Sequence, residues 1–377
     1  MAIDMSGNGS SHPLSTSPAV ARPRSAAVRA VGMWYEPLVS SADPAFVVET
    51  TTWDDFCGLL SSPPRRAELG GPDGGAVVVR DGPDSAVPAA MVEAARQLPV
   101  IVVLDASIDE APASSAIADV IASGADLEAI VERATAHPQA ATALALLLRA
   151  SGTSYVFDGL VAESAVYSTL QSGTEFRSWR ADHPVRSRPV PDAPAVLTSR
   201  SGDVLDVVLN RPEVRNALDA RMRDELWEAF LVAASDPTLT VRWSGAGPSF
   251  CSGGDLDEFG SLPDPASGHL IRLTRSIGLA VHRITDRVTV HVHGSCAGSG
   301  VELPAFAGTV VAAPDARFSL PELQLGLVPG AGGTVSLPRR IGRHRTAWLA
   351  LTGEVIDADR AASWGLVDRI DADPPSE

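Results

Sequence analysis

Two loops rich in glycine and serine constrain this chain more than any other feature of its sequence. Gly245–Asp255 follows a short predicted strand at Val241–Trp243, and Gly294–Gly300 follows an apolar strand at Val288–Val292. Glycine lets a backbone approach another group closely. The second loop runs into a helix predicted from about Ser299, so unpaired main-chain N–H groups can face a negatively charged atom there.

Two glutamates stand beside these loops. Glu302 lies three residues after Ser299, and Glu322 lies twenty residues further on, in a turn bounded by Pro321 and Gly326. Two carboxylates near paired N–H donors can divide base and acid roles at a carbonyl compound. Each feature alone is more often a plain turn, a helix-dipole partner or a helix start. Their order and spacing therefore carry the inference.

The rest of the C-terminal region alternates strands and helices, which predicts an α/β fold. Strands are predicted at 204–209 and 309–312, and helices at 217–234, at 270–284 and from 299. The N-terminal region also has an α/β pattern, with strands at 76–79 and 100–104 and helices at 89–98, 127–137, 140–148 and 159–172.

Composition shifts divide the chain into four parts. Residues 1–27, rich in Ser, Pro, Ala and Arg, are predicted to be a disordered leader. An α/β domain is expected at 28–185, a Pro-rich linker at 186–194 and a second domain at 195–377.

Charge and cysteine content exclude several classes of function. The formal net charge of −16 argues against a nucleic-acid partner. No apolar run is long enough for a membrane helix, so a cytoplasmic location is expected. The three cysteines, Cys57, Cys251 and Cys296, form no metal or disulfide pattern. No metal site is predicted, and Cys251 and Cys296 are interpreted as small semi-buried residues, with a nucleophilic role as the weaker alternative.

Residues 196–370 resemble the enoyl-CoA hydratase/isomerase (crotonase) superfamily. The resemblance is carried by five ordered segments: NRPEVRNAL (210–218), GAGPSFCSGGDL (245–256), HGSCAGSGVEL (293–303), FSLPELQLGLVPGAGGTVSLPRRIG (318–342) and LTGEVIDADRAASWGLVDRI (351–370). It implies a crotonase-like core of ββα units wound as a spiral in the C-terminal half.

The resemblance also implies a set of site residues. The N–H groups of Gly254 and Ser299 would form an oxyanion hole for a thioester, and Glu302 and Glu322 would be the acid/base pair. Ser299 stands where the family usually has glycine, which keeps the N–H but adds a Cβ. The substrate-binding positions implied are Val214, Arg215, Ser252, Asp255 and Leu256.

The implied activity is hydration of a 2-enoyl-CoA, a lyase reaction in which coenzyme A is part of the substrate and no separate cofactor is needed. Enoyl-CoA isomerisation and other crotonase chemistries stay open, as does a non-catalytic acyl-CoA-binding subunit. The family implies a homo-oligomer, a trimer or hexamer.

The N-terminal region has its own resemblance to this family. Residues 137–184, notably ESAVYSTLQSGTEFRSW, are similar to the helices that normally follow the family's core, and the sequence ends soon after GLVDRI (365–370). We therefore expect 28–185 to be a degenerate crotonase-like domain that lacks the catalytic loops and supplies capping helices.

Overall fold

The computed structural model describes residues 47–69, 74–152, 154–187, 189, 192–261 and 264–371. Its N-terminal half is built on a sheet in which each strand pairs in parallel with the next. The inner strands are buried on both faces, as is typical of parallel sheets covered by helices. The four strands are β1 (Val47–Thr52), β2 (Gly75–Arg80), β3 (Ile101–Asp105) and β4 (Val120–Ala122).

Helices connect and follow these strands. The predicted helices of this half are confirmed, with ends that differ by a few residues. The helices are α1 (Trp53–Leu60), α2 (Pro63–Ala67), α3 (Ala89–Arg96), α4 (Gly124–Ala136), α5 (Pro138–Ser151), α6 (Val156–Gln171) and α7 (Thr174–Asp182). The predicted leader, 1–27, lies outside the described residues.

The C-terminal half contains two sheets. The larger has the order β13-β10-β8-β7-β6-β5, parallel except for the β5–β6 hairpin, and the smaller has the order β12-β11-β9. The larger sheet comprises β5 (Val196–Ser201), β6 (Val204–Leu209), β7 (Thr240–Gly245), β8 (Val288–Val292), β10 (Thr309–Ala312) and β13 (Arg369–Ile370). The smaller comprises β9 (Ser295–Ala297), β11 (Arg317–Ser319) and β12 (Ile356–Asp357).

Strands β8 to β11 alternate between the two sheets. Strand β8 of the larger sheet leads into β9 of the smaller one and then into a helix, and β10 leads into β11 in the same way. The expected α/β class is confirmed. Because the chain turns sharply as it changes sheet, the second glycine loop spans the change from β8 to β9 and the start of the helix that carries Glu302.

The helices of this half are α8 (Ala220–Ser235), α9 (Pro265–Thr274), α10 (Ile277–His282), α11 (Ser299–Glu302), α12 (Gly333–Thr352) and α13 (Ala358–Trp364). The prediction of one continuous helix over 270–284 is wrong, because two helices, α9 and α10, occupy this region. The first helix ends before Arg275, and the second begins after Ser276, whose hydroxyl caps it by accepting from the N–H of Leu279 at 3.2 Å. None of the helices in the described part of the chain is both long and apolar enough to cross a bilayer.

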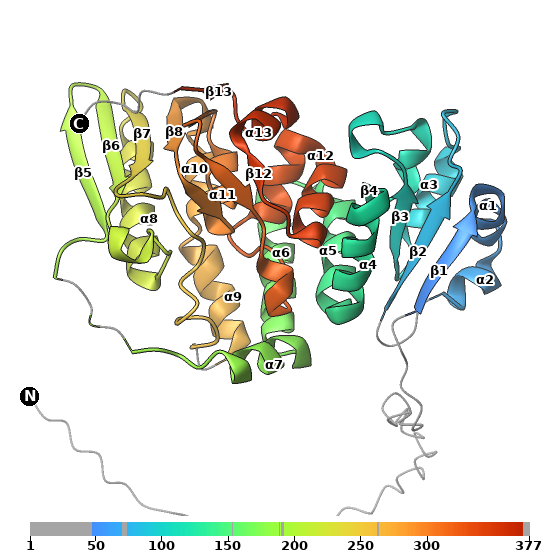
Figure 1. Cartoon of the computed structure of the whole chain (residues 1–377). Coiled ribbons are helices and arrows are strands. Elements are labelled where there is room, and N and C mark those ends of the chain that lie inside the picture. The colour runs from blue at the N-terminus through green and yellow to red at the C-terminus, as the bar shows by residue number, and fades with distance from the viewer. Residues whose placement is uncertain are drawn as a thin grey trace, which may run out of the picture. The chain divides into compact units, whose positions relative to one another are not determined.

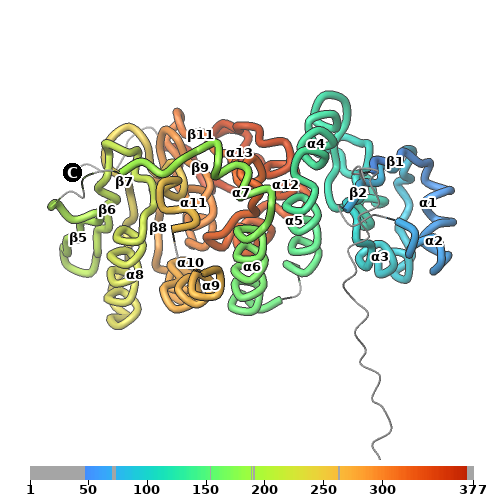
Figure 2. Tube along the Cα trace, turned by 90° about the horizontal axis from the view of Figure 1, so that it is seen from below, coloured from blue at the N-terminus to red at the C-terminus, as the bar shows by residue number. Residues whose placement is uncertain are grey.

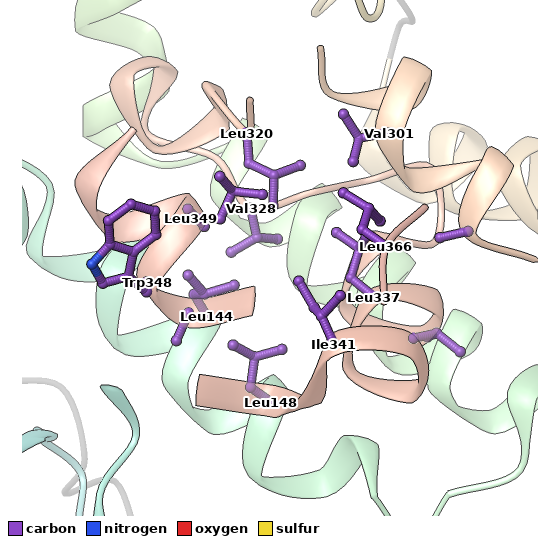
Figure 3. Packing of buried hydrophobic residues seen from close by; sticks show 14 of the residues in the cluster. Leu144, Leu148, Val301, Leu320, Val328, Leu337, Ile341, Trp348, Leu349 and Leu366 are labelled. Carbon is purple, nitrogen blue, oxygen red and sulfur yellow. The ribbon is translucent and has the colours of Figure 1, made fainter. Parts of the chain in front are cut away.

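Helices from the N-terminal half pack directly on the C-terminal half. Helices α4, α5 and α6 contact α12, and α6 also contacts α9 (Figures 1 and 2). Figure 3 shows Leu144 and Leu148 of α5 in one apolar cluster with Leu337, Ile341 and Leu349 of α12. Residues from Pro44 onward form one compact unit. The interpretation of 28–185 as a degenerate crotonase-like domain stays a prediction.

A buried ion pair lies at this contact. Arg149 of α5 donates from Nε to Asp119 Oδ1 at 2.7 Å and from Nη2 to Asp119 Oδ2 at 2.6 Å, and the N–H of Val102 donates to the same carboxylate at 2.8 Å. Arg343 of α12 donates to the carbonyl oxygens of Ala118 and Ala116. Cations from both halves thus converge on the segment before β4.

Removing one partner of this ion pair should be costly. Asp119→Ala leaves the buried Arg149 guanidinium without its carboxylate, so we expect the free energy of unfolding to fall by about 3–5 kcal/mol in urea titrations. Asp105→Ala, which breaks the exposed pair with Arg80 at 3.5 Å, serves as the control and should cost about 1 kcal/mol or less. Equal losses for the two variants would contradict a structural role for the buried pair.

Candidate active site

One cavity brings together most of the residues that the sequence selected. It has a volume of about 440 Å³, and Gly254, Asp255, Ser299, Glu302 and Glu322 all line it. Gly254 lies near the end of the first glycine loop, Ser299 begins α11, and Glu322 begins a short 3₁₀ turn after β11. The two loops and the two glutamates therefore share one enclosed space.

The two expected N–H donors are free of ordinary hydrogen bonds. The neighbours of Gly254 are fixed by Leu218, whose N–H donates to Gly253 O and whose carbonyl accepts from Asp255 N–H. In this parallel bridge the N–H of Gly254 points away from Leu218. Ser299 is the first residue of α11, where N–H groups have no intrahelical acceptor. Neither N–H meets an acceptor within the described ranges.

The position of Gly254 admits no side chain. A Cβ atom there would stand 2.5 Å from the ring of Phe259. The same loop is held from the N-terminal half, because Arg180 of α7 donates from Nη2 to Leu256 O at 2.6 Å. The close packing of Phe259 and the hydrogen bond from Arg180 fix the backbone that presents the Gly254 N–H.

Glu302 is anchored and Glu322 is not. The N–H groups of Ala331 and Gly333 both donate to Glu302 Oε2 at 2.8 Å, at the start of α12. Glu322 Oε2 is buried with no hydrogen-bond partner among the residues described. Glu322 Oε1 lies against Gly298, where φ is +50° and a Cβ atom would approach the oxygen to 2.4 Å. One carboxyl group is thus oriented by amides, and the other has a buried oxygen that lacks a hydrogen-bond partner among the described residues.

A third buried carboxylate, Glu163, comes from α6 in the N-terminal half. Its Oε1 accepts from Gly332 N–H at 2.7 Å, and its Oε2 accepts from the N–H and the hydroxyl of Thr334 at 2.8 and 2.7 Å. Glu163 and Glu302 therefore bind alternate N–H groups of one turn, so an N-terminal residue fixes the segment that orients Glu302.

Burial raises the pKa of all three carboxyl groups. The pKa of Glu163 rises to about 7, with hydrogen bonds from Thr334 and Gly332 opposing the rise. The pKa of Glu322 rises to about 8. That of Glu302 rises well above its ordinary value, because of burial first and then because of the charges of Glu322 and Glu163. Near neutral pH these three carboxyl groups therefore retain protons that exposed glutamates would release.

Sequence reasoning missed Tyr167 and Arg272, which line the same cavity, and Glu163, which lines a smaller cavity together with Arg272. Tyr167 lies on α6 one turn after Glu163, with its ring against Gly330, and Arg272 comes from α9. A weak signal existed for Glu163, because it occupies the same helical face as Leu160, Tyr167 and Leu170. A charged residue on an apolar face is unusual.

The other predicted binding residues lie outside the cavity lining, apart from Asp255, which pairs with Arg211 at 3.1 Å. Ser252 donates its N–H to Arg215 O at 3.0 Å and its hydroxyl to Val214 O at 3.4 Å, so these three residues form a group of their own. Leu256 is 44% exposed. A coenzyme A path along these residues stays a prediction.

The cysteines near the site are buried thiols. Burial raises the pKa of Cys251 and of Cys296, which disfavours the thiolate form that a nucleophile requires. No cluster of three or more His, Cys, Asp or Glu side chains suited to a metal ion occurs in the described part of the chain.

The raised pKa values predict how stability depends on pH. The native state holds protons on Glu163, Glu302 and Glu322 that the unfolded chain releases above a pH near 4.5. These bound protons therefore stabilise the native state fully below pH 4.5, and their contribution is lost as the pH rises through about 8. We expect Glu322→Gln to melt at a higher temperature than the wild type at pH 8 and to lose the advantage near pH 5. A wild type that grows more stable from pH 5 to 8 at constant ionic strength would contradict this.

Comparison with known proteins identifies relatives of this chain. The profile of the enoyl-CoA hydratase/isomerase family matches residues 199–375. A Bacillus subtilis protein named as an enoyl-CoA hydratase/isomerase is 33% identical over 178 residues, which are 47% of this chain and 70% of that protein. Carnitinyl-CoA dehydratase of Escherichia coli K12 is 35% identical over 178 residues, 46% of this chain and 66% of the enzyme.

Among solved structures, enoyl-CoA hydratase from Thermoplasma volcanium aligns with a TM-score of 0.45 and 34% identity, over 48% of this chain and 73% of that one. The family profile matches the half of the chain that carries the glycine loops and the glutamate pair. The Bacillus subtilis relative is covered over 70% of its own length. The chain belongs to the enoyl-CoA hydratase/isomerase (crotonase) family.

Proposed function

We propose that this protein catalyses the reversible addition of water to the double bond of a 2-enoyl-CoA thioester. The observation that carries the proposal is one cavity lined by two free main-chain N–H groups and two buried glutamates. Relatives named as a hydratase/isomerase and as a dehydratase support addition or removal of water as the reaction class.

In this proposal the thioester carbonyl oxygen accepts hydrogen bonds from the N–H groups of Gly254 and Ser299. These donors stabilise the negative charge that grows on that oxygen as water attacks Cβ. The start of α11 adds the favourable end of a helix dipole. Since both donors belong to a fixed backbone, they need no rearrangement during the reaction.

Glu302 and Glu322 act as a coupled pair that holds the attacking water. One carboxylate removes a proton from the water, and the other carboxyl group delivers a proton to Cα on the same face of the double bond. Burial raises the pKa of both groups, and the charges of Glu322 and Glu163 raise that of Glu302 further, so the pair retains at least one proton near neutral pH. The same arrangement run backwards removes water from a 3-hydroxyacyl-CoA. Coenzyme A enters only as part of the substrate, and a trimeric or hexameric assembly and a cytoplasmic location stay predictions.

Glu302→Gln and Glu322→Gln should each lower kcat for crotonyl-CoA hydration by roughly 10²–10⁴-fold, because each removes a proton-transfer group. Loss of the enoyl-thioester ultraviolet absorbance measures the rate. Binding of coenzyme A by calorimetry should survive both changes. Glu228→Gln, on the exposed face of α8, is the control.

Three outcomes would count against hydration. Wild-type protein that binds coenzyme A but turns over no thioester would indicate a non-catalytic subunit. Conversion of a 3-enoyl-CoA to the 2-enoyl-CoA without water addition would indicate an isomerase. Full activity in either glutamine variant would remove that glutamate from the mechanism.

Glu163 is a positioning residue in this proposal. In Glu163→Gln an amide nitrogen would face N–H donors of Gly332 or Thr334, so the turn that orients Glu302 should shift, and we expect kcat to fall by up to about a hundredfold. Removing the charge of Glu163 also lowers the pKa of Glu302, so the pH profile of kcat/KM should move toward acid.

The pH profile separates this role from simple destabilisation. Glu128→Gln, an exposed change on α4 in the same half of the chain, should leave both rate and profile unchanged. A slower Glu163→Gln enzyme with an unshifted profile would mean that Glu163 supports the fold without acting on Glu302.

A further inference from the structure

Arg272 is a partly buried cation in the wall of the proposed active site. It lies on α9 and lines the main cavity together with Glu302 and Glu322. It also lines a smaller cavity of about 120 Å³, which continues toward Leu160 and Ile277. Arg272 therefore lines both cavities and shares the wall of the main one with the glutamate pair.

Its hydrogen bonds leave part of the guanidinium unused. Nε donates to Ser164 Oγ at 3.0 Å, and Nη2 donates to Ser164 O at 3.3 Å and to Ser168 Oγ. The guanidinium carbon lies 4.7 Å from the ring centre of Tyr167. Nη1 has no acceptor, and the side chain forms no ion pair, within the ranges that the structure describes.

The other charged groups around the cavity have partners of their own. Asp219 and Asp255 pair with Arg211 at 3.0 and 3.1 Å. Glu258 accepts from Ala220 N–H at 2.7 Å, and Arg223 pairs with Asp224 at 2.9 Å. Among the described charged groups that line the main cavity, Arg272 is therefore a cation with no carboxylate at ion-pair distance, and the charge of Glu163 acts on it without a direct contact. A partly buried cation held this way is stabilised when a ligand supplies the missing anion.

We propose that Arg272 binds an anion on the acyl chain, so that the preferred substrates are coenzyme A thioesters of dicarboxylic acids. The inference rests on the proposed acyl-CoA function. The free Nη1 would donate to the terminal carboxylate, a charge-assisted hydrogen bond. Because Glu302 and Glu322 retain protons near neutral pH, they add less negative charge against such a substrate than their number suggests.

Saturated thioesters test this subsite without any turnover. Glutaryl-CoA and adipyl-CoA carry the terminal carboxylate, and 5-methylhexanoyl-CoA and 6-methylheptanoyl-CoA replace it with a neutral group of the same branching. We expect calorimetry to give tighter binding of each acid than of its neutral counterpart by roughly 10- to 100-fold. Arg272→Gln should abolish this ratio, and Arg272→Lys should keep part of it. The control, Arg283→Gln, removes an equal charge at the exposed end of α10 and should leave the affinity ratio unchanged.

The affinity ratio decides the proposal, since all four ligands share the same coenzyme A phosphates. A wild type that does not discriminate, or an Arg272→Gln variant that keeps the ratio or weakens all four ligands equally, would overturn it. If no thioester binds, the proposed function and the subsite both fail. If the acids bind more tightly through Arg272 but 2-enoyl-CoA is not hydrated, only the proposed reaction fails.

Discussion

Four successive N–H groups at the start of α12 hold the candidate site together. Consecutive N–H groups at a helix start have no intrahelical acceptors, so they are open to side chains. Ala331 and Gly333 donate to Glu302, while Gly332 and Thr334 donate to Glu163. One glycine-rich turn thus holds two carboxylates that would otherwise repel each other, and the helix dipole favours both.

This turn also joins the two halves of the chain. Glu302 belongs to the half with the family's catalytic loops, whereas Glu163 belongs to α6 of the other half. Tyr167 and Arg272 extend the same contact along α6 and α9, and the apolar packing of α5 on α12 lies beside it. A helix outside the five segments that carry the resemblance of residues 196–370 therefore lies in the wall of the cavity and limits the directions in which Glu302 can point.

Burying three carboxyl groups in one place lowers the stability of the fold, because desolvation disfavours the charged form of each group. Desolvation raises the pKa of Glu163, Glu302 and Glu322, and the hydrogen bonds to Glu163 and Glu302 offset only part of that effect. The result is a set of acids that retain protons at pH values where exposed glutamates are ionised. Such tuning suits acid/base chemistry better than stability, as is common for functional sites.

The sequence by itself determined the α/β class, most of the strands and helices, and the loops and glutamates that meet in the cavity, because local patterns and motif spacing encode them. The break at Ser276 depended on a single capping hydroxyl that periodicity does not register. Only the tertiary structure decided that Glu163, Tyr167 and Arg272 belong to the site. Arg272 lies 109 residues from Glu163 in the sequence, and the packing of α6 on α9 and α12, an apolar contact between distant segments, is what places these side chains beside the glutamate pair.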